Sequence, residues 1–152
     1  MIRPPKNLPS WCFVRLVREP GTTLQPGYRV RGPGDVQRLL HERTGLLDVE
    51  AFYIVALGSG SQVRAIHEVS RGTLNSSLVH PREVFRAAIL AGAAGIILVH
   101  NHPSGDPAPS ADDRAVTRQL VDAGRLLDVP VYDHVILAGD SRYVSFAEAG
   151  LL

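Results

Sequence analysis

The feature that most constrains the fold is the apolar run Ile96-Ile97-Leu98-Val99, which leads into His100-Asn101-His102 and a loop rich in proline and glycine. A run that is apolar on both faces is typical of a central strand with helices packed on both sides. Side chains two residues apart on a strand point to the same side. His100 and His102 are therefore predicted to aim at one point, at a strand end of the kind that often forms a ligand site in α/β sheets.

The rest of the chain alternates between strand and helix signals. Further strands are predicted over residues 11–17, 51–57, 63–69, 131–138 and 143–146, and the turn residues 58–61 join two of them into a hairpin. One short helix is predicted between Pro33 and Gly45, a second from Pro81 to Gly92, and a third that opens at Ser110 and ends before Pro130. This order predicts an α/β fold in which a mixed sheet is flanked by helices.

Length and composition favour one globular domain over residues 11–152, preceded by a flexible tail over residues 1–10. No apolar stretch approaches the roughly 20 residues of a membrane span, and no secretory signal follows the first methionine. The single cysteine, Cys12, excludes an intrachain disulfide and a cysteine-rich zinc site. A cytoplasmic protein is expected.

The charge is uneven, because residues 1–45 carry eight Lys and Arg against three Asp and Glu. Such a basic region could contact nucleic acid through Arg15, Arg29 and Arg31, although no basic stripe with interleaved aromatic residues is present. We favour the simpler interpretation, that these are solvated surface charges. The strand predicted near the N-terminus could also pair with a second copy of the chain to form a homo-oligomer.

The residues around the two histidines suggest a metal site. Asp113 lies one turn into the helix that opens at Ser110, and the loop between could bring its carboxylate beside His100 and His102. Two imidazoles and a carboxylate can bind Zn²⁺ and leave a fourth position for water, as in catalytic zinc sites. Ser-x-x-Asp at a helix start is also a capping box, which needs no metal.

A zinc hydrolase also needs a general base. Glu50, Glu68 and Glu83 all precede the motif near element ends, and spacing does not select among them. Asp133 and His134 could orient a ligand, but we favour a structural role for this pair. His41 and His67 are interpreted as solvated or hydrogen-bonded residues outside the site, and His80, before Pro81, as a helix-entry residue rather than a site residue.

The metal-site motif and the stretches around it show a family resemblance. His-x-His, seven residues, Ser, two residues and Asp resembles the JAMM motif of JAB/MPN-domain metalloproteins. The stretch from Gly72 to Phe85, the run His100 to Asp106, the pair Asp133-His134 and the closing residues 143–145 are similar to the RadC-like branch. The likeness is dense from about residue 46 onward.

The resemblance implies a JAB/MPN fold, related to the cytidine-deaminase-like α/β class, and a Zn²⁺ held by His100, His102 and Asp113. It implies Glu50 as general base and Ser110 as the residue that binds the zinc water or stabilises the oxyanion. The implied activity is hydrolysis of a peptide or isopeptide bond in a peptide or protein substrate. The alternative is a non-catalytic or DNA-associated module of the RadC type, in DNA repair or mobile elements, although the helix-hairpin-helix region of longer RadC proteins is not seen here.

Two other enzyme classes are excluded by residue types. A zinc nucleobase deaminase needs a His-x-Glu and a Cys-x-x-Cys, and this chain has one cysteine. The letters His100-Asn101-His102 also spell the name of the HNH nucleases, but the residues of that motif are spread over a β-β-helix unit.

Overall fold

The computed structural model describes residues 27–72, 79–139 and 141–152, which form a five-stranded mixed sheet with helices on both faces. The strands are β1 (Ala51–Leu57), β2 (Val63–Arg71), β3 (Gly95–Asn101), β4 (Val131–Ala138) and β5 (Arg142–Ser145), in the order β2-β1-β3-β4-β5. β3 and β4 are parallel and the other neighbours are antiparallel. The predicted α/β class with a mixed sheet is confirmed, and the architecture is consistent with the JAB/MPN fold.

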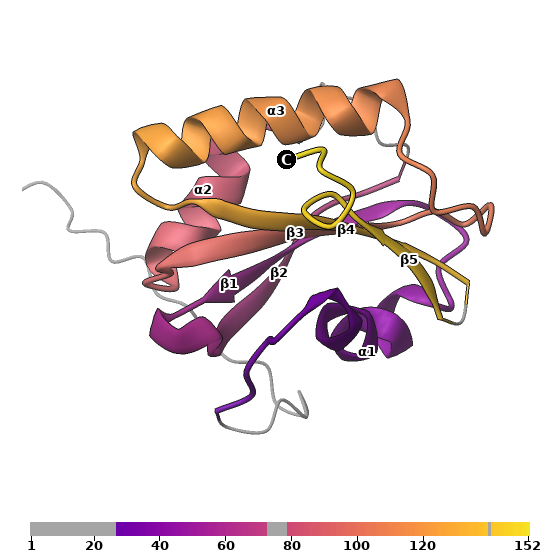
Figure 1. Ribbon diagram of the computed structural model, residues 1–152, viewed down its shortest axis with the longest axis horizontal. Coiled ribbons are helices and arrows are strands. Elements are labelled where there is room, and N and C mark those ends of the chain that lie inside the picture. The colour runs from indigo at the N-terminus through magenta and orange to yellow at the C-terminus, as the bar shows by residue number, and fades with distance from the viewer. Residues whose placement is uncertain (1–26, 73–78, 140) are drawn as a thin grey trace, which may run out of the picture.

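The three helices divide between the two faces of the sheet. α2 (Pro81–Leu90) and α3 (Ala111–Leu126) cover one face, and α1 (Pro33–Thr44) covers the other (Figure 1). Alternation along the strands supplies both cores. Phe52, Ile54, Ile96 and Leu98 pack toward α2 and α3, whereas Tyr53, Val55, Ile97 and Val99 pack toward α1.

This alternation decides where the polar end of β3 points. β3 is buried at all seven positions, as predicted for a central strand. His100 continues the face of Ile96 and Leu98, toward α3, and Asn101 continues the face of Ile97 and Val99. At the C-terminal end of β3, the His100 imidazole and the Asn101 amide therefore point to opposite faces of the sheet.

Local signals explain where the helices begin. Proline occupies the first position of α1 and of α2, where its missing N–H costs no hydrogen bond. Ser110 caps α3 with its side chain. The predicted helix starts are confirmed, and His80 is the exposed residue before α2, as expected of a helix-entry residue.

The predicted hairpin is confirmed, since β1 and β2 pair antiparallel around a short 3-10 turn, η1 (Ser59–Ser61). Gly60 has a φ of 68°, which glycine adopts at little cost. β2 and β3 each extend two residues beyond their predicted ends, and β5 begins one residue early. The predicted tail over residues 1–10 and strand over 11–17 lie outside the described residues.

None of the helices in the described ranges is long and apolar enough to cross a membrane.

Candidate metal centre

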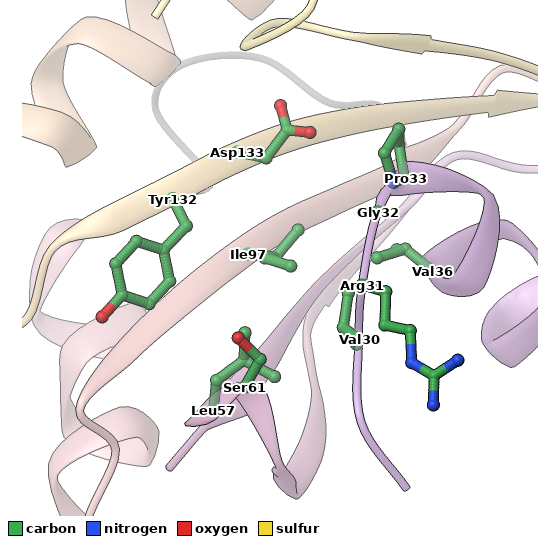
Figure 2. A pocket seen from close by; sticks show the side chains of 10 residues that line it. All are labelled: Val30, Arg31, Gly32, Pro33, Val36, Leu57, Ser61, Ile97, Tyr132 and Asp133. Atoms are coloured by element: carbon green, nitrogen blue, oxygen red, sulfur yellow. The ribbon is translucent and has the colours of Figure 1, made fainter. Parts of the chain in front are cut away.

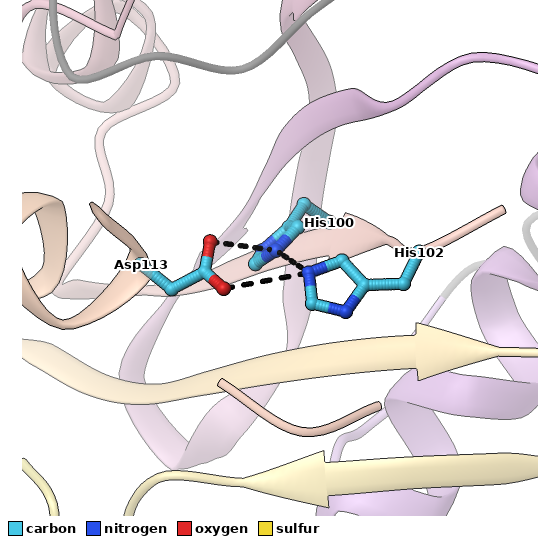
Figure 3. Close-up of side chains that lie close together, drawn as sticks. All are labelled: His100, His102 and Asp113. Carbon is cyan, nitrogen blue, oxygen red and sulfur yellow. Dashed lines mark hydrogen bonds and ion pairs between the residues drawn. The ribbon is translucent and has the colours of Figure 1, made fainter. Parts of the chain in front are cut away.

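Three side chains from two elements meet at the end of β3. His100 is the penultimate residue of β3, His102 directly follows the strand, and Asp113 is in the first turn of α3. The intervening loop turns at Gly105, which has a φ of 82°, and so returns the chain to the strand end. Within the residues that the structure describes, these three form the group able to hold a metal ion (Figure 3).

The distances among the three side chains fit a small metal ion. His100 Nε2 lies 2.9 Å from His102 Nε2 and 3.1 Å from Asp113 Oδ1, and His102 Nε2 lies 3.4 Å from Asp113 Oδ2. Tetrahedral zinc with bonds of about 2.0–2.1 Å places neighbouring ligand atoms about 3.3 Å apart. The donor set and its spacing therefore suit zinc with one position left open.

The electrostatics favour a cation at this point. Burial raises the pKa of the Asp113 carboxyl, but the close contacts with His100 and His102 outweigh burial and hold that pKa well below its usual range. The hydrogen bond to Asp113 raises the pKa of His102, against the opposing effect of burial. Asp113 is thus an anion at neutral pH, and its negative charge favours binding of a cation at this point.

Ser110 and Asp113 form the capping box that the sequence left as an alternative. Asp113 N–H donates to Ser110 Oγ over 3.0 Å, and Ser110 N–H donates to Asp113 Oδ2 over 2.7 Å. Asp113 Oδ2 is also the atom nearest His102. The cap and the metal site are therefore compatible, because the cap fixes the carboxylate that faces the histidines.

The three candidate general bases have different surroundings. Glu50 directly precedes β1 and is half-buried, and its charge is one of those that raise the pKa of His102. Glu68 instead accepts hydrogen bonds from Tyr53 and from Arg71. Glu83, in the first turn of α2, pairs with arginines on its own helix. Of the three, Glu50 is the one whose charge acts on a residue of the histidine cluster.

Asn101 is a residue whose role the sequence analysis did not identify. Its Oδ1 accepts the N–H of Ala51 over 2.8 Å, and its Nδ2 donates to the carbonyl of Val49 over 3.0 Å. The side chain therefore holds the backbone on both sides of Glu50. Its position between the two histidines could have predicted this role, because side chains alternate along a strand and Asn101 must point to the face opposite His100.

A second missed feature is a buried layer behind His100. His134 of β4 is fully buried, and its Nε2 lies 2.8 Å from His100 Nδ1. Its other nitrogen, Nδ1, lies 2.6 Å from the hydroxyl of Thr117 on α3. Burial, together with the nearby charge of His100, holds the pKa of His134 well below its usual range. The expected structural role is therefore incomplete, since His134 contacts a candidate ligand directly.

Asp133 has the structural role that was predicted. Its carboxylate accepts the N–H groups of His134 and Ala147 and the hydroxyl of Ser145. It therefore holds the segment after β5 against β4. The neighbouring side chains of β4 point to opposite faces, so Asp133 and His134 do not act as one pair.

Asp133 also lines a separate pocket between the sheet and the segment that leads into α1 (Figure 2). The lining is largely apolar and includes Val30, Ile97 and Tyr132. Arg31 lies at its rim in Figure 2. The pocket is on the α1 face, away from the histidine cluster, and Asp133 is already hydrogen-bonded.

The remaining histidines lie outside the centre. His41 is in the last turn of α1. His67 is in β2, where burial and the nearby charge of Arg86 lower its pKa. Arg29 donates to the carbonyl of Gly60, and Arg15 lies outside the described residues. Nucleic-acid binding and self-association stay predictions.

Comparison with known proteins agrees with this geometry. A family model described as a RadC-like JAB domain matches residues 30–151. A UPF0758 protein of Moorella thermoacetica is 53% identical over 123 residues, covering 81% of this chain and 53% of the relative. UPF0758 proteins of Desulfitobacterium hafniense, 50% identical over 123 residues (81% and 54% covered), and Methanosarcina acetivorans, 44% identical over 128 residues (84% and 56% covered), are also similar. The chain thus spans about half the length of these curated relatives.

Proposed function

The chain belongs to the RadC-like JAB-domain family, and on that premise we propose that it is a zinc-dependent hydrolase of peptide or isopeptide bonds. The observation that carries the proposal is the convergence of His100, His102 and Asp113 on one point, with ligand atoms 2.9–3.4 Å apart. Three protein ligands with a fourth position open are typical of catalytic rather than structural zinc.

The proposed ligands are His100, His102 and Asp113. When bound there, zinc supplies a Lewis acid and lowers the pKa of water to about 7. His102 Nδ1 donates to the carbonyl of Asp106 over 2.8 Å, which holds the ring while Nε2 faces the metal. Burial of the cluster under Phe52, whose ring stacks on His100 at 5.9 Å, keeps the site in a low dielectric.

Glu50 is proposed as the general base. It accepts a proton from the attacking water and passes it to the nitrogen of the leaving amine as the carbon–nitrogen bond breaks. Its half-buried position directly before β1 places its charge near His102, a proposed ligand. Asn101 keeps this residue in place by its two backbone hydrogen bonds.

Ser110 is proposed to stabilise negative charge on the carbonyl oxygen. Its Oγ uses a lone pair to accept the N–H of Asp113, which leaves the hydroxyl proton for donation elsewhere. The residue is exposed at the N-terminus of α3, where the helix dipole adds a favourable field for an anion.

Metal analysis and activity separate the parts of this proposal. Protein purified without added metal is expected to hold about one zinc per chain, and His100→Ala is expected to lose it. Activity is measured on quenched-fluorescence peptide pools and on lysine isopeptide substrates. Glu50→Gln should keep the metal and lose at least 100-fold in turnover, because a positioned base contributes about 10²–10⁴-fold.

Glu68→Gln and Glu83→Gln are the matched controls, because these carboxylates are engaged by arginines or by Tyr53. Both should keep wild-type activity. Wild-type protein without stoichiometric metal would contradict the proposed function. An unchanged rate in Glu50→Gln would contradict the assigned base.

A further inference from the structure

The proposed hydrolysis makes no use of a polar contact between two fully buried side chains, those of His100 and His134. Both histidines have an exposed fraction of 0%, and Thr117, which contacts His134, has 1%. His134 packs between two aromatic rings, edge-on to Phe52 and stacked on Phe146 at 4.7 Å. Buried polar groups are costly unless hydrogen-bonded, so the proton positions in this layer follow from its contacts.

The first proton is fixed by Thr117. Its Oγ1 lies 2.6 Å from the carbonyl oxygen of Asp113, one turn earlier in α3. A carbonyl oxygen can only accept, so the single hydroxyl proton of Thr117 points to Asp113. Toward His134 Nδ1, which is also 2.6 Å away, the hydroxyl can then only accept. His134 must therefore carry a proton on Nδ1.

The second proton follows from the first. The His134 ring is neutral, because it is fully buried between aromatic rings and its two nitrogens contact a hydroxyl and an imidazole rather than a carboxylate. A neutral imidazole protonated on Nδ1 has a lone pair on Nε2. His100 Nδ1, 2.8 Å from that lone pair, must donate. His100 then offers the lone pair of Nε2 toward His102 and Asp113.

The contacts of His102 also place its proton on Nδ1, through a different hydrogen-bond partner. His102 Nδ1 is 2.8 Å from the carbonyl oxygen of Asp106, which also can only accept. Both imidazoles thus carry their proton on Nδ1 and turn Nε2 to the shared point. His102 donates to an exposed loop carbonyl. His100 instead donates to His134, which is itself held by Thr117 and, through it, by the backbone carbonyl of Asp113.

We propose that Thr117 and His134 are positioning residues that lock His100 in the Nδ1–H tautomer and so present its Nε2 lone pair to the metal. The chain runs from the Asp113 carbonyl through Thr117 and His134 to His100. It links the ligand on α3 to the ligand on β3 through β4. The inference rests on the metal site of the proposed function, but on no step of the hydrolysis.

Replacing Thr117 gives the sharpest test, because valine has the same shape and lacks the hydroxyl. In Thr117→Val the Nδ1–H of His134 loses its acceptor, so the favoured tautomer of His134 moves its proton to Nε2. That proton then faces His100 Nδ1, which must accept and so moves its own proton to the metal-facing Nε2. Thr117→Ser keeps the hydroxyl and is the matched control.

Two measurements are made on each protein. Long-range proton–nitrogen NMR correlations, recorded on protein stripped of metal with a chelator, report which ring nitrogen of His100 and His134 carries the proton. Competition with a chromophoric chelator gives the dissociation constant for Zn²⁺. Wild type and Thr117→Ser should show Nδ1–H on both rings. Thr117→Val should shift both rings toward Nε2–H and weaken zinc binding about 10–100-fold, the usual range for outer-shell partners of metal ligands.

A wild-type spectrum with the proton of His100 on Nε2 would overturn the inference, and this measurement needs no variant to fold. Wild-type tautomers and wild-type zinc affinity in a folded Thr117→Val protein would overturn it equally. The expected tautomers in a wild-type chain that binds no zinc would instead refute the proposed function and leave the proton assignment standing.

Discussion

Asn101→Ala should separate the support of the general base from the metal ligands. Asn101 lies between two proposed ligands in sequence, but its amide points to the other face and binds the backbone at Val49 and Ala51. Truncation removes both hydrogen bonds and adds no bulk. The ligand histidines keep their own supports, since His102 N–H donates to the carbonyl of Leu137 over 2.8 Å.

The cost can be worked out bond by bond. Ala51 is fully buried, so its N–H would have no partner, which costs about 1–3 kcal/mol. Val49 is 38% exposed, so water can replace the amide at its carbonyl and the loss there is about 0.5–1 kcal/mol. Together these losses predict that the free energy of unfolding falls by roughly 1.5–4 kcal/mol. For a domain of this size, that lowers Tm by roughly 3–16 °C.

The assay is thermal unfolding at fixed zinc concentration, together with metal content and turnover on the same samples. We expect a lower Tm, an unchanged metal content and a slower turnover, because Glu50 loses its fixed backbone. Gln119→Ala is the control: this exposed amide on α3 should change stability by less than about 0.5 kcal/mol. A Tm within 2 °C of wild type, or loss of the metal, would refute the reasoning.

Three other outcomes are expected. Zinc binding requires the loss of the proton on the His102 nitrogen that faces Asp113, and the contact with Asp113 raises the pKa of His102. Below that pKa, the zinc dissociation constant measured in chelator titrations should therefore rise about tenfold for each unit by which the pH falls. A dissociation constant that does not change from pH 5 to 8 would contradict this. Burial, aided by the hydrogen bond to Glu68, raises the pKa of Tyr53 to about 12, so the folded state favours the protonated phenol. The free energy of unfolding, measured by urea titration, should therefore fall by roughly 2–3 kcal/mol between pH 10 and 12. Tyr53→Phe should abolish this loss. A methyl group at Gly124 would lie 2.6 Å from a backbone oxygen, so Gly124→Ala should cost about 1–3 kcal/mol in unfolding free energy; wild-type stability would show that the α3 end can shift freely.

Much of the fold was predictable from local patterns. The buried run 96–99, the hairpin around residues 58–61 and the proline starts of two helices are signals that neighbouring residues carry by themselves. Strand ends were less predictable. β2 continues to Arg71 because its pairing with β1 continues to Ala51, and pairing is a property of two segments.

The candidate site was predictable in part. Spacing placed His100 and His102 on one side of a strand and made Asp113 a possible third ligand. The family resemblance selected Glu50 among three glutamates and implied a role for Ser110. From the sequence, Ser110 and Asp113 could be interpreted either as a capping box or as part of a metal site. The structure shows the cap together with the approach of its carboxylate to the histidines.

The sequence by itself thus determined the elements, the order in which they occur and the pair of histidines at a strand end, because period and spacing act over a few residues. Only the tertiary structure decided which distant groups support them. Asn101 reaches the backbone around Glu50 through strand pairing, and His134 reaches His100 because β4 lies parallel to β3 under α3. Those contacts join residues 34 to 52 positions apart, and no local pattern encodes which buried polar groups will satisfy one another.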